Sequence, residues 1–318
     1  MTLQRDTSTV IPDAVPGNWV DRYAPANWRP YLKLARFDRP IGAWLLLFPC
    51  WWSLALAELA RGQPYPNPWY LLLFAAGAFV MRGAGCAYND IVDRHYDASV
   101  ARTASRPVAS GQITVRHAFL FAIVLSLAGF VILIQFNEFT VRLGIASLAL
   151  VAVYPFMKRY SYWPQLLLGL TFKWGALVGW AAVYGRLDAA ALALYAGCVL
   201  WTLGYDTIYA HQDKDDDALL GLKSTALRFG EDTDKWVGGF YASAVMLWAI
   251  AGFVAGAHLI FFTTLALVAL QLAWQVTTLD THEAQNCLRR FRSNRHVGWA
   301  IFLGLIADMA LSTLAGRT

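Results

Sequence analysis

The sequence predicts an all-α integral membrane protein, a polytopic bundle of nine transmembrane helices. Of its 318 residues, 58% are hydrophobic and 15% are charged, with a mean hydropathy of +0.42, whereas about a quarter of the residues of a soluble domain are charged. Nine apolar segments have the length, roughly 17–25 residues, that spans a bilayer. The basic residues between these segments lie mostly on one side of the membrane.

The expected spans are joined by short turns or polar loops, and no separate soluble domain is visible. Residues 1–35 are expected to form a polar cytoplasmic N-terminal segment, and residues 36–318 a single transmembrane domain. The 14 Trp, 14 Tyr and 18 Phe residues exceed what interfacial belts need, so we expect some of them to line a cavity. The expected spans are 41–60, 68–88, 118–136, 140–157, 164–184, 189–209, 236–256, 258–278 and 296–315.

The distribution of Lys and Arg predicts a cytoplasmic N-terminus and an external C-terminus. Met1–Trp28 is polar and has no apolar core, so it is not a secretory signal peptide. Because this segment also holds Asp6, Asp13 and Asp21, we expect a bacterial inner membrane in preference to a mitochondrial inner membrane, whose targeting peptides are poor in acidic residues.

Several classes of function find no support in the sequence. The net charge of +5 follows from the topology, and no nucleic-acid partner is expected, because no basic run alternates with aromatics in a polar domain. The four cysteines lack CxxC spacing, which argues against a zinc site or structural disulfides. The histidines show no metal spacing, and His95 and His211 are expected at the loop surface. No GxSxG, Walker or GxGxxG motif indicates nucleophilic catalysis or nucleotide binding.

The second expected span ends in a polar stripe. Asn89, Asp93 and Asp97 are spaced i, i+4 and i+8, so they share one face of a helix, and Arg82 lies on that face seven residues earlier. A hydrophobic chain carries such charge at a membrane boundary only if the charge is compensated. The compensation that we expect is a divalent cation that holds a phosphate-bearing substrate.

A second acidic cluster follows the sixth expected span. Asp213 and Asp217 are spaced i and i+4, and Asp206 lies on the same face seven residues before Asp213. Magnesium prefers oxygen ligands and is commonly held by one or two carboxylates together with substrate phosphates. We therefore expect the two clusters to face each other and bracket a diphosphate through Mg²⁺. A solvated acidic helix end is the plainer interpretation of either cluster alone.

Cations on the same side of the membrane are candidates for the diphosphate oxygens that magnesium leaves free. We expect Arg102 and Lys158 to contact the diphosphate. For Arg106 and Arg159 two interpretations stay open, a diphosphate contact and a topology marker that follows the positive-inside rule.

Three further cations lie at or inside the expected spans. Arg82 needs an anionic partner, which is either a neighbouring acid such as Asp93 or the carboxylate of a substrate, which a planar guanidinium matches. Arg39, at the start of the first span, is a second candidate for a substrate carboxylate. Lys173 either serves the same pocket or extends to the membrane edge.

At these residues the chain resembles the UbiA superfamily of intramembrane prenyltransferases. The run Asn89–Asp97 matches the family pattern NDxxDxxxD, and Arg102–Pro107 continues it as RTxxRP. The second motif is DxxxD at Asp213–Asp217, followed by Gly-x-Lys-Ser-Thr at residues 221–225.

Two other runs resemble the 4-hydroxybenzoate polyprenyltransferase branch of this superfamily, namely Tyr205–Ala210 and Tyr154–Arg159. The resemblance extends from about Arg36 to the end of the seventh span. Lys173 departs from it, because a neutral residue is expected at that position.

The resemblance implies nine spans around a central cavity, in which a polyprenyl group passes from polyprenyl diphosphate to the ring carbon ortho to the hydroxyl of 4-hydroxybenzoate. This reaction is a membrane step of ubiquinone biosynthesis and depends on Mg²⁺. Arg82 and Arg39 would orient the benzoate carboxylate, Tyr154 and Asp206 are further substrate contacts, and faces such as Tyr154, Trp174 or Tyr209 would shield the cationic allylic carbon. The implied holders of the magnesium–diphosphate are Asn89, Asp93, Asp97, Asp213 and Asp217, assisted by Arg102 and Lys158.

Three alternatives stay open. In the first, the same chemistry prenylates a different aromatic acceptor. An ion-coupled transporter would place its acids near the bilayer midplane on broken helices, whereas these acids cluster at one surface. A scaffold in a lipid-biosynthetic assembly is the third class.

Overall fold

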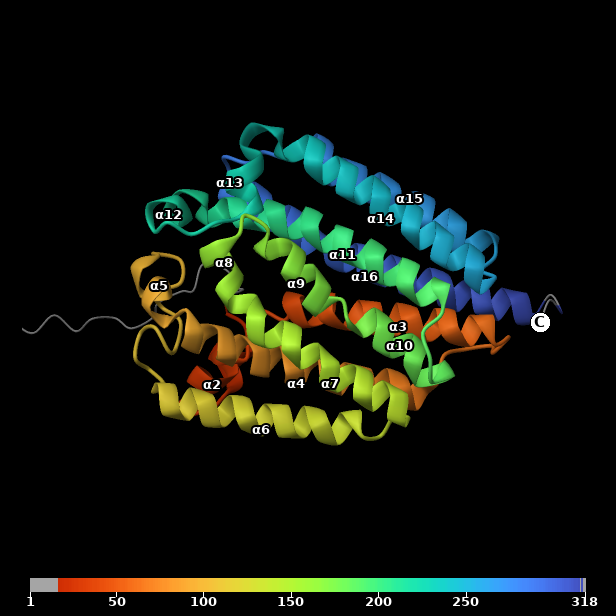
Figure 1. The fold of residues 1–318 in the computed structure, drawn as a ribbon, viewed down its shortest axis with the longest axis horizontal. Helices are drawn as coiled ribbons and strands as arrows, with labels where there is room; N and C mark the ends of the chain where they lie inside the picture. The colour runs from red at the N-terminus through yellow and green to blue at the C-terminus, as the bar shows by residue number, and fades with distance from the viewer. Residues whose placement is uncertain (1–16, 315, 317–318) are drawn as a thin grey trace, which may run out of the picture. The chain divides into compact units, whose positions relative to one another are not determined.

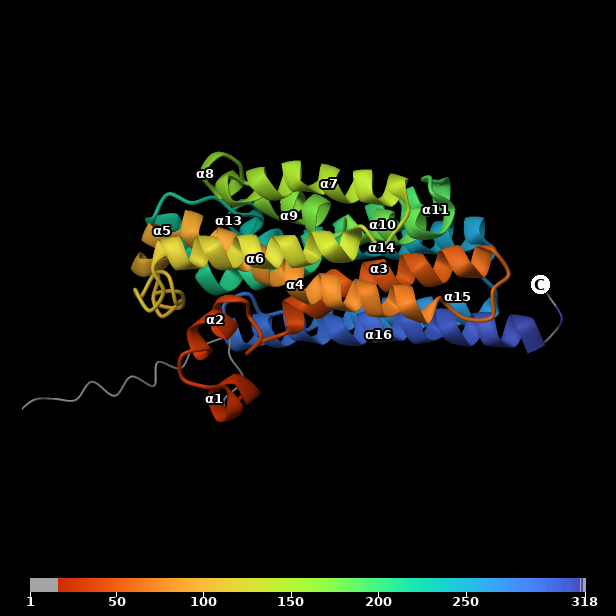
Figure 2. The same cartoon turned by 90° about the horizontal axis from the view of Figure 1, so that it is seen from below.

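The computed structural model describes residues 17–314 and 316, and within these residues the fold is all-α, without β-strands (Figures 1 and 2). Nine helical segments of the described chain are long and apolar enough to cross a bilayer, so the predicted fold class and number of spans are confirmed. The long helices are α3 (Ile41–Ala60), α4 (Pro68–Val92), α6 (Val115–Leu133), α7 (Glu138–Val153), α9 (Pro164–Phe172), α10 (Gly175–Tyr184), α11 (Ala189–Ala210), α14 (Thr233–Ala255), α15 (Leu259–Thr277) and α16 (Ala284–Leu314). The short ones are α1 (Trp19–Tyr23), α2 (Arg29–Leu34), α5 (Arg94–Ser99), α8 (Met157–Tyr160), α12 (Lys214–Leu219) and α13 (Thr225–Phe229), with 3₁₀ turns η1 (Tyr154–Phe156), η2 (His211–Asp213) and η3 (Gly230–Asp232).

The described chain forms two compact units. The first comprises the described residues of 1–42 together with Val80–Gly129, and the second comprises Ala43–Phe79 together with the described residues of 130–318. The predicted boundary at residue 36, between a polar segment and a transmembrane domain, stays a prediction. Residues 1–16 of that segment lie outside the described residues.

A small apolar core holds the first unit together. Leu34 of α2, Ala87 of α4 and Ala118 of α6 are fully buried in one cluster. Val108 and Ile113, from the loop between α5 and α6, are buried in the same cluster. Because this loop shares a core with α4, it is folded back onto the helix that carries the first acidic motif.

Helix α11 is the centre of the second unit, where it packs along α14 and also contacts α9, α10 and α16 (Figure 1). Two glycines allow the close approach of α14. A Cβ added to Gly197 would lie 2.7 Å from the Trp248 ring, and one added to Gly204 would overlap the Tyr241 ring. Small residues are typical of membrane helix pairs, because association in lipid depends on close contact between backbones.

A buried polar network joins four helices of the second unit. The indole N–H of Trp201 on α11 donates to Asn294 Oδ1 on α16 at 2.7 Å, and the amides of Asn294 and Gln275 on α15 exchange hydrogen bonds of 3.3 Å. The hydroxyl of Tyr241 on α14 donates to Gln275 Oε1 at 2.9 Å. Polar groups inside a membrane protein are stable when they satisfy one another, so this network fixes the order of the four helices.

The outer faces of α14 and α15 are apolar and exposed, as expected for helices in contact with hydrocarbon. The exposed fractions of their side chains reach 78% at Phe253 on α14 and 79% at Leu259 on α15.

Two elements differ from the expected spans. The segment expected at 164–184 is two helices, α9 and α10, with a break at Lys173 and Trp174, which hydropathy does not register because both halves are apolar. Helix α16 begins at Ala284 instead of residue 296. Its first turns are polar, so the helix is longer than the apolar part that hydropathy detects. In these turns Arg290 donates to the carbonyl of Asn286 in the same helix and to that of Thr278, just after α15.

Candidate functional site

The first acidic motif lies at the junction of α4 and α5. The backbone N–H of Asp93 donates to the carbonyl of Asn89 at 2.9 Å, and that of Asp97 donates to the carbonyl of Asp93 at 2.8 Å. The i, i+4, i+8 spacing is thus maintained through the junction. Asp93 and Asp97 are only 2% and 5% exposed, and buried carboxylates are costly unless they are paired or bound to a cation.

Both acidic motifs share one local architecture. Asp93 precedes α5 with φ −94° and ψ 3°, and Asp213 precedes α12 with φ −116° and ψ 9°. This sparsely populated backbone region is common at active sites. In each motif, therefore, a long membrane helix ends, one aspartate occupies this conformation, and a six-residue helix follows.

Asp90 is the centre of an ion network that the sequence did not reveal. Its two carboxylate oxygens accept from Nη2 of Arg36 at 2.7 and 2.9 Å, and the Asp90 side chain is 1% exposed. Arg106 Nη1 lies 3.4 Å from Asp90 and 2.8 Å from Asp97 Oδ2. Arg106 thus pairs with an acid of the first motif, and its two interpretations, a diphosphate contact and a topology marker, both stay open.

Arg36 holds a rare conformation, with φ +63°, the one positive value among the non-glycine residues that the structure describes. Such a conformation costs about 1–2 kcal/mol, which the two contacts to Asp90 offset. Burial lowers the pKa of the Arg36 guanidinium, but the charges of Asp90, Cys86 and Asp38 together raise it, and the pKa stays above its ordinary value. Arg36 therefore stays charged, and it anchors the turn before α3 to α4.

The two arginines expected to bind a substrate carboxylate both belong to the first unit. A Cβ added to Gly42 would lie 2.7 Å from Nε of Arg82, so this guanidinium lies against the backbone at the start of α3. Arg39, three residues before Gly42, contacts Asp38 at 3.3 Å. Asp38 is 2% exposed, and burial raises the pKa of its carboxyl although Arg39 opposes the shift.

In the second unit, the loop after the second motif is bonded to the basic segment around α8. The N–H of Leu222 donates to the carbonyl of Asp217 at 2.9 Å. The N–H of Lys223 donates to the carbonyl of Lys158 at 2.8 Å, and its ammonium donates to the carbonyl of Tyr160 at 3.1 Å. Lys158, a predicted diphosphate contact, is therefore joined through Lys223 to the loop that follows α12, the helix that carries Asp217.

The rest of the Gly-x-Lys-Ser-Thr run is structural. Ser224 caps α13, where its side-chain oxygen accepts from the N–H of Leu227. The Thr225 hydroxyl lies 2.6 Å from that of Thr207 on α11, and the Thr225 N–H donates to Gln165 on α9 at 3.0 Å. These bonds hold the second motif's loop onto α9 and α11.

The remaining predicted contacts are half-buried. Tyr154 begins η1, Asp206 lies near the end of α11, and Arg102 lies in the loop after α5. Next to Arg102, the Thr103 hydroxyl donates to the carbonyl of Asp97 at 2.9 Å, which fixes this loop at the first motif. The binding roles of these residues stay predictions, as does the meeting of the two motifs.

Two of the three aromatic residues named as candidate cation shields have well-defined neighbours. The Tyr209 ring lies 4.4 Å from that of Phe291 on α16, between ring centroids. The indole N–H of Trp174 donates to the carbonyl of Leu143 on α7 at 2.9 Å. Trp174 therefore braces the break between α9 and α10.

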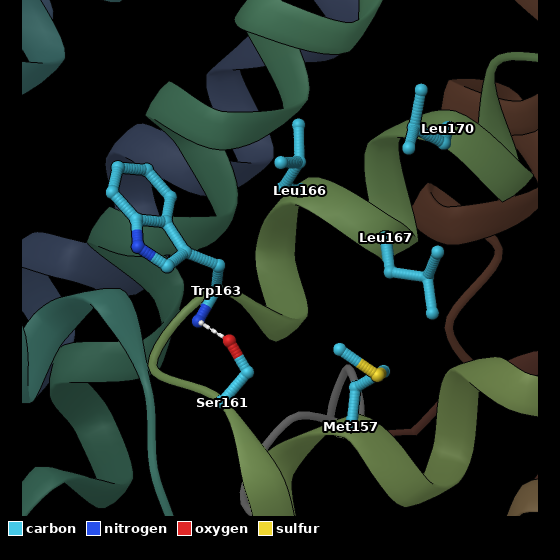
Figure 3. A pocket seen from close by; sticks show the side chains of 6 residues that line it. All are labelled: Met157, Ser161, Trp163, Leu166, Leu167 and Leu170. Carbon is cyan, nitrogen blue, oxygen red and sulfur yellow. Dashed lines mark hydrogen bonds between the residues drawn. The ribbon is translucent and has the colours of Figure 1, made fainter.

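An apolar pocket of about 420 Å³ lies beside the basic segment, between α8 and α9 (Figure 3). Its one hydroxyl, that of Ser161, accepts from the backbone N–H of Trp163 at 3.1 Å. No predicted site residue lines it, and its walls suit hydrocarbon better than a charged diphosphate. The lining residues are Met157, Ser161, Trp163, Leu166, Leu167 and Leu170.

His211 departs from the expectation of a loop-surface residue. It is 7% exposed, and its Nε2 lies 2.9 Å from the Thr233 hydroxyl at the start of α14. His211 begins the 3₁₀ turn η2, and its side chain is buried although charged residues follow from Asp213 onward. His95 is exposed, as expected.

The donor chemistry of the first motif fits magnesium. Within residues 17–314 and 316, no three His, Cys, Asp or Glu side chains are arranged to hold a metal by themselves, and the four cysteines are buried thiols. Magnesium does not need such a cage, because one or two carboxylates and substrate phosphates suffice. Asn89, Asp93 and Asp97 offer the required oxygen ligands.

The fold and site define a class of all-α membrane proteins. In the part of the chain that the structure describes, nine helical segments can span a bilayer, and two helix junctions carry acidic motifs. The model of the UbiA prenyltransferase family matches residues 46–306. The chain belongs to this family, as predicted.

Curated relatives carry one name. The mitochondrial 4-hydroxybenzoate polyprenyltransferase of Bos taurus is 50% identical over 288 residues, 89% of this chain and 76% of the relative. That of Homo sapiens is 49% identical, with the same coverage. That of Arabidopsis thaliana is 45% identical over 304 residues, 95% of this chain and 74% of the relative. These names confirm the predicted branch of the family.

Solved structures agree with the fold. An apo UbiA homolog from Aeropyrum pernix K1 is 28% identical with a TM-score of 0.70, covering 83% of this chain and 98% of that one. A UbiA homolog from Archaeoglobus fulgidus, bound to GPP and Mg²⁺, has a TM-score of 0.64 over 87% of this chain and 99% of that one. At 18% identity, the second likeness concerns the fold alone.

The expected bacterial inner membrane is wrong, because the close relatives are mitochondrial proteins, although the multi-pass membrane character is confirmed. The acids near the N-terminus misled the prediction. Asp21 belongs to α1 and pairs with Lys33 at 2.8 Å, so it is part of the folded protein and says nothing about targeting. Asp6 and Asp13 lie outside the described residues.

Proposed function

We propose that the chain transfers a polyprenyl group from polyprenyl diphosphate to the ring carbon ortho to the hydroxyl of 4-hydroxybenzoate, with Mg²⁺ as cofactor, in ubiquinone biosynthesis. The observation that carries the proposal is the repeated junction of Asp93 and Asp213, where a buried membrane helix ends in carboxylates. The names of the relatives at about half identity support the same reaction.

In this proposal the magnesium–diphosphate is held by the oxygen ligands of the two acidic motifs, namely Asn89, Asp93, Asp97, Asp213 and Asp217. Bound magnesium supplies positive charge that stabilises the departing diphosphate. Arg102 and Lys158 contact diphosphate oxygens, since guanidinium and ammonium groups form strong charge-assisted hydrogen bonds with phosphate.

The acceptor is oriented by its carboxylate. Arg82, whose guanidinium lies against Gly42, and Arg39 bind this group, because the planar fork of arginine matches a carboxylate. Tyr154 and Asp206 complete the substrate contacts.

The reaction breaks the bond between the allylic carbon and the diphosphate oxygen and forms a carbon–carbon bond to the ring. The ring proton then passes to a carboxylate or to the departing diphosphate. Exclusion of water by the surrounding helices protects the cation-like carbon from hydrolysis.

The test uses the purified chain in lipid nanodiscs with polyprenyl diphosphate and 4-hydroxybenzoate, and product is measured by mass spectrometry. We expect product with Mg²⁺ and none with a chelator. Asp93→Asn and Asp213→Asn are expected to lower the rate at least about hundredfold, which corresponds to about 2.7 kcal/mol. Asp215→Asn, at an exposed position of α12, is the matched control and should keep the rate.

Unchanged rates in Asp93→Asn and Asp213→Asn would overturn the proposal. Product with other phenols but not with 4-hydroxybenzoate would assign a different aromatic acceptor. Ion flux in proteoliposomes without product would instead identify a transporter.

A further inference from the structure

We propose that Lys173 is a positioning residue, whose ammonium replaces a backbone N–H that Pro49 lacks and thereby fixes the turn of α11 that carries Tyr205 and Asp206. The positioning role rests on the proposed function, whereas the pairing of Lys173 with Pro49 does not. Lys173 is a charge at a position where the family resemblance predicts a neutral residue, and the structure shows it 0% exposed.

Pro49 frees one carbonyl inside α3. In an α-helix, the N–H of residue 49 would bond the carbonyl of Leu45, but proline has no N–H. The ammonium of Lys173 donates to this same carbonyl at 2.7 Å. Leu45 is 1% exposed, so water does not reach the carbonyl, and an unbonded carbonyl in a membrane interior is strongly unfavourable.

The break between α9 and α10 brings Lys173 to this position. Lys173 has φ −100° and ψ 4°, and α10 resumes at Gly175. A Cβ added to Gly179 would lie 2.6 Å from the carbonyl oxygen of Cys50, so α10 packs directly on α3 beside Pro49. The Ser53 hydroxyl also donates to the carbonyl of Ala176.

The other side of the ammonium faces α11. Lys173 Nζ lies 4.4 Å from the ring centroid of Trp201 and 5.1 Å from that of Tyr205, and both rings are at most 2% exposed. Desolvated cations bind aromatic faces well. The Trp201 indole N–H is bonded to Asn294, so its ring has a fixed orientation.

The ammonium therefore joins α3 to the part of α11 just before the second acidic motif. Tyr205 precedes Asp206, a proposed substrate contact, and Asp213 lies two turns further on. Without the ammonium, this part of α11 loses its cation link to α3 and keeps the packing of the Trp201 ring against that of Trp52 on α3, so we expect substrates to bind but react slowly.

The first experiment, the melting cycle, is a double-mutant cycle in which the melting temperature is measured in nanodiscs. It compares the unmodified chain with Lys173→Met, Pro49→Ala and the double variant. Lys173→Met leaves the Leu45 carbonyl unbonded, so its melting temperature should fall by at least about 5 °C. In the Pro49→Ala background the substituted alanine supplies the N–H, and the same change should cost less than half as much. Pro164→Ala is the matched control, because Pro164 is at the first position of α9, where no N–H is needed.

A Lys173→Met cost that is the same in the Pro49→Ala background would overturn the pairing. If Lys173→Met does not fold, the pairing of Lys173 with Pro49 predicts that the double variant with Pro49→Ala does fold. If neither variant folds, the pairing is overturned. These outcomes do not depend on any enzyme activity.

The second experiment tests the positioning role with kinetics well below the melting temperature. We expect folded Lys173→Met to lower kcat at least tenfold with KM for both substrates within twofold, and Lys173→Arg to keep most of kcat. Full kcat in folded Lys173→Met overturns the positioning role. Absence of product from the unmodified chain refutes the proposed function instead, and leaves the melting cycle to decide the pairing.

Discussion

Removal of Asp90 is the most direct test of how the first acidic motif is held. Asp90→Ala deletes the carboxylate that contacts Arg36 at 2.7 and 2.9 Å and that lies 3.4 Å from Arg106. Removing one partner of a buried ion pair costs about 3–5 kcal/mol. Because the Arg36 side chain is 10% exposed and can gain some hydration, we expect the lower end, about 3 kcal/mol.

The assay is a double-mutant cycle with Arg36→Ala, Asp90→Ala and both changes, followed by reversible unfolding in mixed micelles. We expect a coupling of about 2 kcal/mol or more, since the two side chains are in direct contact. The matched control is the pair Arg142 and Glu138, whose side chains are 75% and 79% exposed, and its coupling should stay below about 0.5 kcal/mol. A coupling for Arg36 and Asp90 as small as that of the control would refute the reasoning.

Three other predictions concern a helix cap, glycine packing and pH. Asp308 accepts hydrogen bonds from the N–H groups of His258 at 2.7 Å and Phe261 at 3.2 Å at the start of α15, so Asp308→Ala should lower the free energy of unfolding by about 1–3 kcal/mol. The control Thr263→Ala, at an exposed position of the same helix, should lower it by less than about 0.5 kcal/mol. Equal losses for the two variants in an unfolding titration would contradict the role of Asp308 as a cap. Gly197→Ala places a methyl group 2.7 Å from the Trp248 ring and should lower the free energy of unfolding by about 1–3 kcal/mol. Gly239→Ala, whose methyl group meets open space, should leave this free energy unchanged or raise it by up to about 1 kcal/mol. Thermal melts that rank the two variants in the opposite order would contradict the packing argument. Burial raises the pKa of Asp38 above its ordinary 3.8. The folded state therefore binds this proton more tightly than the unfolded state, and the free energy of unfolding falls as pH rises from 3.8 through the raised pKa. Asp38→Asn should flatten the dependence of the melting temperature on pH in this range, and an unchanged slope would exclude the effect.

Hydropathy was sufficient to predict the spans, because burial in a bilayer requires an apolar segment of defined length. The first span was predicted at 41–60, and α3 covers the same residues. The break at Lys173 was missed because it lies between two apolar stretches, and its stabilising partner, the Leu45 carbonyl, is a backbone atom 128 residues away. Sequence patterns reveal side chains and not backbone hydrogen bonds. The freed carbonyl of Leu45 is therefore indicated in the sequence only by Pro49, and nothing there shows that Lys173 is its donor.

The candidate site was predicted only in part, because local spacing shows which residues share a helix face but not their partners from distant segments. The stripe of Asn89, Asp93 and Asp97 follows from helical spacing, and the structure has it. Asp90 falls off that stripe, and its partner Arg36 is 54 residues away, so local spacing did not reveal the pair. The positive φ of Arg36 has no sequence signature, because such a conformation is usual for glycine and rare for arginine.

Lys223 has a consequence for how the second unit can move. Its backbone and its ammonium are both bonded to carbonyls of the segment around α8, at Lys158 and Tyr160. A displacement of the loop after α12 that keeps these two bonds would therefore also displace Lys158. If Lys158 and Asp217 bind the diphosphate as proposed, their contacts with it are coupled through Lys223.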